Sequence, residues 1–283
     1  MQNLSEIGDV LETVVGNKIS LRYLKAGSGA PLILLHTIRT QLDYFQEVIP
    51  ALAKNYTVYA LDLPGHGQSS IDKKANYDEA YLRKAVAEFI QKLNLEQVTL
   101  VGESIGGVLA LTLASTIPER IIKVVASNTY DYDTRYADGV RRGNFFANFV
   151  LFNYSIPVNG AIFAALENWL FLGMVLKGGL KNKKWMPKAL LSKINRAGYR
   201  KGFRYVERNV FENWRSWGKA RSLYSAVKAP VKLIYGDYDW STLQERERTA
   251  KELGNANIIT LKNTGHFGFV DNPQKLVEII LAK

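Results

Sequence analysis

The sequence of 283 residues contains no cysteine and only three histidines. Without cysteine there is no disulfide framework, no thiolate metal site and no cysteine nucleophile. Three histidines leave little scope for a histidine metal cluster, so we expect neither a metal ion nor another cofactor. Any chemistry must therefore come from Ser, Asp, Glu, Lys or from the imidazoles of His36, His66 and His266.

Long hydrophobic runs are also missing. The one apolar stretch worth testing as a membrane span, residues 156–176, is interrupted by Pro157, Asn159, Gly160, Glu167 and Asn168. Polar groups are costly in hydrocarbon, so the sequence predicts no transmembrane helix. The first ten residues include Glu6 and Asp9 and no apolar core flanked by positive charge. We therefore expect no secretory signal and a cytoplasmic location.

Negative charge is scarce in one part of the chain. The formal net charge is +11, and residues 130–222 hold 17 Lys and Arg against 6 Asp and Glu. The remaining residues hold 20 of each kind. The same central segment contains 18 of the 32 aromatic residues. We interpret 130–222 as an insertion into a globular protein whose apolar content, 47%, is ordinary.

The two flanks of this segment alternate between strand and helix patterns. Short apolar runs predict strands at Val10–Val15, Ile19–Leu24, Leu32–Leu35, Thr57–Leu61, Val98–Val101, Ile122–Ala126, Val231–Tyr235 and Ile258–Leu261. The first two form a hairpin whose turn lies at Gly16-Asn17. Helical spacing predicts helices at Leu42–Leu52, Asp78–Leu93, Ile105–Thr116 and Gln244–Leu253, and a closing helix from Pro273. The pattern predicts an α/β fold, an eight-stranded and mostly parallel sheet covered by helices on both faces.

The most specific motif is Gly102-Glu103-Ser104-Ile105-Gly106, which lies between a buried strand and an apolar helix. This is the context of the G-x-S-x-G nucleophile elbow. The chain turns so tightly there that residues two before and two after the serine have no room for a Cβ atom. The motif predicts that Ser104 is a nucleophile, with its hydroxyl at the N-terminus of the following helix.

A serine nucleophile needs a base that is oriented by an acid. Hydrolases with such an elbow place the acid and then the histidine after the serine. His266 is the only histidine after Ser104, whereas His36 and His66 are expected to be structural. Asp237 and Asp239 both follow the predicted strand 231–235 and are candidates for the acid.

Five motifs in this order resemble the α/β-hydrolase superfamily, in its cap-bearing branch of esterases, meta-cleavage-product hydrolases and cofactor-free haloperoxidases. They are Leu35-His36, the segment Asp62 to Ser69, the elbow, Gly236-x-x-Asp239 and Gly265-His266-Phe267. The resemblance implies a catalytic triad of Ser104, Asp239 and His266, with Asp237 in a loop-capping role. Asp131 occupies an alternative location of the acid in some members. A serine at position 104 excludes the aspartate-nucleophile dehalogenases and epoxide hydrolases of this branch.

The resemblance also implies an oxyanion hole formed by the backbone N–H groups of Ile38 and Ile105. Relatives usually have glycine where this chain has Thr37, and a β-branched residue resists positive φ, so the loop is expected to differ in shape. A second departure is the segment Trp240-Ser241-Thr242-Leu243 after the acid, where a proline is common, and it has no functional account from sequence.

Two charged residues near the motif have competing interpretations. Arg39 could bind a substrate carboxylate or phosphate, but an ion pair with Asp43 or with another loop carboxylate is favoured. Glu103, inside the elbow, is expected to be a structural hydrogen-bond or ion-pair partner.

The predicted domains are an α/β-hydrolase core, residues 1–129 and 223–283, and a helical, basic, aromatic-rich cap at 130–222. The apolar cap favours a lipophilic small-molecule substrate and a carboxylic ester hydrolase. A carbon-carbon bond hydrolase on the same triad and a non-catalytic ligand receptor are the alternatives.

Lysines around Trp185 could contact an anionic membrane, although their favoured role is to solubilise the cap. They are Lys177, Lys181, Lys183, Lys184 and Lys188. No nucleic-acid partner is expected, because no recognition motif is present. The sequence makes no prediction about the oligomeric state.

Overall fold

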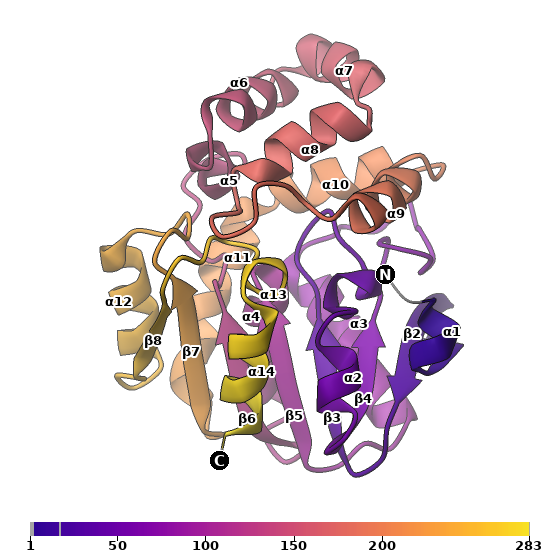
Figure 1. Cartoon of the computed structure of the whole chain (residues 1–283), viewed down its shortest axis with the longest axis vertical. Helices are drawn as coiled ribbons and strands as arrows, with labels where there is room; N and C mark the ends of the chain where they lie inside the picture. The colour runs from indigo at the N-terminus through magenta and orange to yellow at the C-terminus, as the bar shows by residue number, and fades with distance from the viewer. Residues whose placement is uncertain (1–2, 17, 283) are drawn as a thin grey trace.

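The computed structural model describes residues 3–16 and 18–282, and its centre is one eight-stranded sheet (Figure 1). The strands are β1 (Asp9–Val15), β2 (Ile19–Ala26), β3 (Ala30–Leu35), β4 (Tyr56–Leu61), β5 (Val98–Glu103), β6 (Ile121–Ser127), β7 (Val231–Gly236) and β8 (Ile258–Leu261). Their order in the sheet is β1-β2-β4-β3-β5-β6-β7-β8. The β1–β2 and β2–β4 pairs are antiparallel, and the other neighbours are parallel. The predicted fold class is confirmed.

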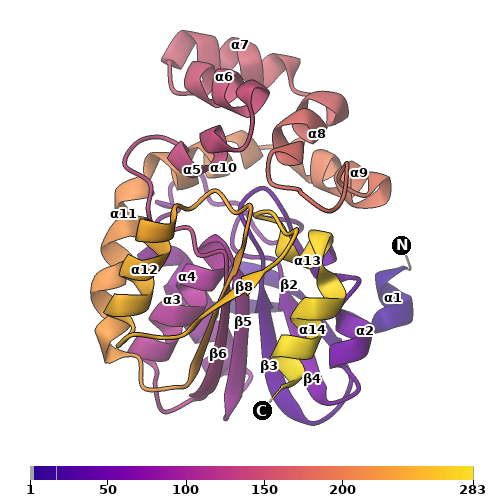
Figure 2. The ribbon, with the colours of Figure 1, turned by 60° about the vertical axis from the view of Figure 1, so that its left-hand side comes forward.

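Helices cover both faces of this sheet (Figure 2). On one face lie α3 (Glu79–Lys92), α4 (Ile105–Thr116) and α12 (Leu243–Glu252), and on the other lie α2 (Ile49–Leu52) and α14 (Pro273–Leu281). Two further short helices are α1 (Leu4–Ile7) and α13 (Gly268–Asp271). All six residues of β5 and the first ten of α4 are buried. The strand that carries the elbow is therefore the centre of the core.

The predicted helix Leu42–Leu52 is wrong as a continuous element. The structure has a 3-10 helix, η1 (Leu42–Phe45), and then the separate helix α2. Pro50 lies in the first turn of α2, where its missing N–H costs nothing, whereas inside a longer helix it would remove a hydrogen bond. The predicted turn at Gly16-Asn17 lies partly outside the described residues, because Asn17 is not among them.

Between β6 and β7 the chain forms helices that lie over one edge of the sheet (Figure 1). They are α5 (Asp138–Arg142), α6 (Phe145–Tyr154), α7 (Pro157–Leu166), α8 (Trp169–Lys177), α9 (Lys188–Gly198) and α10 (Phe203–Glu212). The next two elements, α11 (Trp214–Ala220) and the 3-10 helix η2 (Arg221–Ala226), pack on the core helix α4 instead. We call α5 to α10 the cap helices, and the borders of the cap at 130 and 222 stay a prediction. None of the helices within 3–16 and 18–282 has the length and apolar character needed to cross a membrane.

Candidate active site

Ser104 lies at the sharp turn between β5 and α4 and has φ +60° and ψ −122°. A non-glycine residue at positive φ is strained, so the surroundings must hold it there. A Cβ atom on Gly102 would lie 2.0 Å from the carbonyl oxygen of Gly106, and one on Gly106 would lie 2.1 Å from that of Leu35. Both glycines are thus required by close backbone approach, as the motif predicts.

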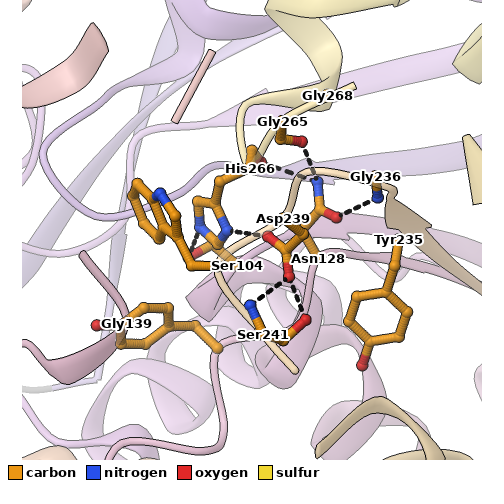
Figure 3. Close-up of polar contacts among 12 residues, drawn as sticks. Ser104, Asn128, Gly139, Tyr235, Gly236, Asp239, Ser241, Gly265, His266 and Gly268 are labelled. Atoms are coloured by element: carbon orange, nitrogen blue, oxygen red, sulfur yellow. Dashed lines mark hydrogen bonds and ion pairs between the residues drawn. The ribbon is translucent and has the colours of Figure 1, made fainter. Parts of the chain in front are cut away.

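The structure brings the side chains of Ser104, His266 and Asp239 into one hydrogen-bonded chain (Figure 3). Ser104 Oγ lies 3.0 Å from His266 Nε2, and His266 Nδ1 lies 2.5 Å from Asp239 Oδ1. In the tautomer with a proton on Nδ1, the imidazole donates to the carboxylate and its Nε2 accepts the serine proton. This is the geometry that a serine nucleophile, its base and an acid that orients the base require.

The carboxylate of Asp239 is held in its charged form by several donors. Burial by itself raises its pKa, but His266 and the donors of Ser241 outweigh burial and hold the pKa below its usual value. Ser241 donates to Asp239 Oδ2 through its backbone N–H at 3.0 Å and through its hydroxyl. Arg246 Nε in turn donates to the Ser241 hydroxyl at 2.9 Å. Sequence reasoning missed Ser241 and Arg246. Their polar side chains follow the acid by two and seven positions, and this closeness could have indicated that they stabilise its carboxylate.

The imidazole of His266 is held by an aromatic ring that sequence analysis left unexplained. Trp240 stacks on it with ring centroids 3.8 Å apart and planes 13° apart. The indole Nε1–H donates to the carbonyl of Gly178, just after α8, at 2.9 Å. Trp240, the first residue of the segment that departs from the relatives, therefore connects His266 to the end of a cap helix.

Asn128, just after β6, connects the loop that carries Asp239 with the loop that carries His266. Its amide nitrogen donates to the His266 carbonyl at 2.9 Å, and its amide oxygen accepts from Gly236 N–H at 2.9 Å (Figure 3). Sequence reasoning missed this residue because nothing in its neighbourhood indicates contacts more than a hundred positions away.

The two other candidate acids have different partners. Asp237 is half-buried, and its Oδ1 accepts the backbone N–H of Thr264 at 3.0 Å. Asp131 is fully buried and accepts the hydroxyl of Tyr224 at 3.0 Å. Burial raises the pKa of Asp131 to about 6. Asp237 caps its loop as expected, and Asp131 belongs to a separate buried cluster.

His36 and His66 both lie in the core as neutral side chains. His36 Nδ1 donates to the carbonyl of Thr37 at 2.8 Å, and its Nε2 accepts the N–H of Leu63 at 3.0 Å. Burial lowers the pKa of His36 to about 4 and that of His66 to about 3. Both histidines brace the loops after β3 and β4, in agreement with the structural role expected for them.

Glu103 is fully buried beside Ser104 but points away from it toward other donors. Its carboxyl accepts the backbone N–H of Gly268 at 2.8 Å and the hydroxyl of Tyr44. Burial raises its pKa to about 8, although these donors act in the opposite direction. Glu103 is a structural hydrogen-bond partner, as expected, and links the elbow to α13.

Ile38 and Ile105, the residues expected to form an oxyanion hole, line the same small cavity of about 10 Å³. Ile105 is the first residue of α4, so its N–H has no acceptor within the helix. The expected difference in shape from a glycine-containing loop stays a prediction for the loop that carries Ile38. Its residue at positive φ is Arg39, at +63°, rather than Thr37.

The guanidinium of Arg39 is buried between two carboxylates of the cap. Its Nε lies 2.9 Å from Glu207 Oε1, and its Nη2 bonds Glu167. The pair with Asp43 is not formed, because the carboxylate of Asp43 binds Lys193 Nζ at 2.5 Å. The other expected partner, a loop carboxylate, is Glu167, which lies between α7 and α8. The ion pairs connect the candidate oxyanion loop to the cap.

A cavity of about 320 Å³ lies between the cap helices and the loops of the site. Apolar residues of α6 and α8 form much of its wall, namely Val150, Leu151, Phe171, Leu172, Val175 and Leu176. Ile38, Trp240 and Phe267 belong both to this wall and to the loops around Ser104. Ser104 itself is fully buried, so the site is closed to bulk solvent in this conformation.

Fold and site together define an enzyme of the α/β-hydrolase type. Residues 30–273 match the family model described as the alpha/beta hydrolase fold, and the chain belongs to this family. Within the described part of the chain, no group of three His, Asp or Glu side chains is placed to hold a metal ion.

Relatives of known sequence and structure extend over almost the whole chain. The uncharacterized hydrolase YugF of Bacillus subtilis is 26% identical over 273 residues, which cover 95% of this chain and 94% of the relative. The (E)-2-((N-methylformamido)methylene)succinate hydrolase of Acinetobacter baylyi is 23% identical and covers 95% of each chain. The crystal structure of the enol-lactonase from Burkholderia xenovorans LB400 is similar with a TM-score of 0.75 and 19% identity. The match covers 96% of this chain and 98% of the lactonase, and it shows that the two proteins have similar folds.

Proposed function

We propose that the protein hydrolyses carboxylic esters of lipophilic small molecules through an acyl-enzyme on Ser104. The observation that carries this proposal is the continuous chain from Ser104 Oγ through His266 to Asp239, with distances of 3.0 and 2.5 Å. A pure binding module has no need of all three groups in this order. The apolar cavity beside them supports a lipophilic acyl or alcohol part.

In the first half-reaction Ser104 Oγ attacks the acyl carbon while its proton moves to His266 Nε2. Asp239 stabilises the imidazolium that forms. The backbone N–H groups of Ile38 and Ile105 are the proposed donors to the oxyanion. The tetrahedral intermediate collapses, the C–O bond to the alcohol breaks, and Nε2–H gives its proton to the leaving oxygen.

In the second half-reaction a water molecule takes the place of the alcohol. His266 Nε2 accepts a proton from the water, whose oxygen attacks the acyl carbon. The intermediate releases the carboxylic acid as the proton returns to Ser104 Oγ. No step requires a redox group or a metal ion.

Carbon-carbon bond hydrolysis on the same triad has less support. That reaction favours a cation near the serine for an anionic substrate, and Arg39 is the candidate. Its guanidinium is already bound by Glu167 and Glu207. For Arg39 to bind a substrate anion, that anion would have to displace one of these two carboxylates.

A panel of p-nitrophenyl esters of increasing acyl length tests the proposal directly. We expect hydrolysis with an optimum in acyl length set by the cavity, and a loss of kcat on the order of 10⁶-fold in Ser104→Ala. A vinylogous diketone assayed in parallel tests carbon-carbon cleavage. Cleavage of the diketone without ester hydrolysis would replace the ester proposal, and equal rates for wild type and Ser104→Ala would refute the role of the serine.

A further inference from the structure

Large apolar side chains are exposed along the three outermost cap helices. We call them the apolar face: Phe145, Phe149, Phe152, Ile156, Val158, Ile162, Trp169 and Leu170. Phe145 is 85% exposed and Val158 is 72% exposed, values high for side chains of this kind. Isolated exposed apolar residues are common on proteins, but a contiguous group indicates an interaction site.

Helical spacing gathers the exposed side chains of one helix on one side of it, and α7 and α8 both pack against α6. Phe145, Phe149 and Phe152 are separated by four and three residues and share one side of α6. Val158 and Ile162 are four apart on α7, which packs against α6. Both views show α6 and α7 at the end of the molecule farthest from the sheet (Figure 1, Figure 2).

The apolar face carries almost no charge, although the cap around it is strongly basic. From residue 145 to 176 the only charged residue is Glu167, whose carboxylate is bound by Arg39 and by Tyr154. Residues 130–222 nevertheless have a net charge of +11. Exposed cations such as Lys177, at the end of α8, and Lys188, at the start of α9, follow this uncharged segment.

We propose that the apolar face docks on an anionic lipid surface. Aromatic and aliphatic side chains of α6, α7 and α8 would enter the interface, and the cations would lie near the anionic headgroups. The sequence left a membrane contact of the lysines around Trp185 open, and the present proposal places the contact on the apolar face, with Lys177 and Lys188 following it in the chain. Trp185 packs against Gly173 of α8, and Lys183 pairs with Glu47.

A second copy of the chain is a less suitable occupant of this face. A twofold contact would place the same surface of each copy against the other. Residues 130–222 of the two copies, each with a net charge of +11, would then come close together around the apolar contact, and like charges repel, whereas an anionic bilayer complements them.

The inner sides of α6 and α8 line the cavity beside the site, so docking places that cavity next to the lipid. A lipophilic substrate would then enter from the bilayer. This last step rests on the proposed ester hydrolysis, whereas the docking itself does not. Binding is therefore measured without any substrate.

The test is co-sedimentation of the full chain with vesicles of phosphatidylcholine containing phosphatidylglycerol. Wild type should pellet at low salt and be released as salt rises, because exposed charges are screened. The double variant Phe145→Ser, Val158→Ser should bind at least 10-fold more weakly. Leu243→Ser is the matched control, because this leucine is 67% exposed on α12 of the core, and it should bind like wild type.

Thermal unfolding and hydrolysis of a short soluble ester show that the double variant is folded, since neither position lines the cavity. If wild type does not pellet at low salt, or if the double variant pellets as well as wild type, the proposal is overturned. A dimer in sedimentation velocity that the double variant abolishes, without vesicle binding, would assign the face to a second copy.

Discussion

Two carboxylates only two positions apart, Asp237 and Asp239, have different surroundings in the fold. Asp239 is buried against His266 and receives two donors from Ser241. Asp237 caps a loop through the N–H of Thr264. The neighbouring contacts, rather than the residue type, decide which carboxylate can orient the imidazole.

Asparagine at position 239 tests this difference. The amide cannot stabilise the imidazolium and can stabilise the wrong tautomer, so Asp239→Asn should lower kcat by roughly 10³- to 10⁴-fold. Ester hydrolysis at saturating substrate is the measurement. Asp237→Asn, the matched control, should retain most of the activity, and the reverse order of effects would move the acid to Asp237.

The residues that sequence reasoning missed share a physical cause. Trp240, Ser241 and Asn128 act through contacts formed only when distant loops meet at the edge of the sheet. The meeting of Ser104 and His266 in one site was predictable because a tight turn and a fixed chain order restrict the residue types there. A stacking indole follows no such local rule.

At the scale of elements, the elbow depends on the close approach of α4 to β3. A Cβ atom at position 106 would lie 2.1 Å from the backbone oxygen of Leu35, and backbone atoms do not move aside easily. At position 107 the nearest atoms would be 3.2 Å away, a contact that small shifts relieve.

We therefore expect Gly106→Ala to lower the free energy of unfolding by about 3 kcal/mol or more, as overpacking a rigid site does. Gly107→Ala, the control on the same helix, should cost much less. Urea unfolding of both variants, followed by circular dichroism, gives the two values. Equal and small losses would show that the elbow is not held by backbone contact.

The elements themselves were largely predictable, since buried parallel strands appear as short apolar runs and their order in the chain is regular. All eight strands are confirmed, with borders that differ from the prediction by at most two residues. The continuous helix predicted for Leu42–Leu52 was wrong. The spacing of apolar residues does not show that one helix ends at Phe45 and that a second begins next to Pro50. The shape of the candidate oxyanion loop also depends on contacts with the cap, through Arg39.

At the scale of the whole molecule, the segment with the cap helices and the rest of the chain differ in charge. Residues 1–129 and 223–283 carry no net charge, whereas residues 130–222 carry +11 and include the apolar face. Between them, Arg39 and Trp240 connect the cap to the loops around Ser104. The cap therefore contacts the loops around Ser104 directly, through Arg39 and Trp240.

The central claim is that His266 activates Ser104 as a nucleophile, and labelling with a fluorophosphonate tests it most directly. Intact-mass and peptide mass spectrometry should find one adduct per chain, on the peptide that contains Ser104. The Ser104→Ala variant should remain unlabelled while its thermal unfolding is nearly unchanged. A folded wild type that forms no adduct, or an adduct on another residue that persists in Ser104→Ala, would contradict the account.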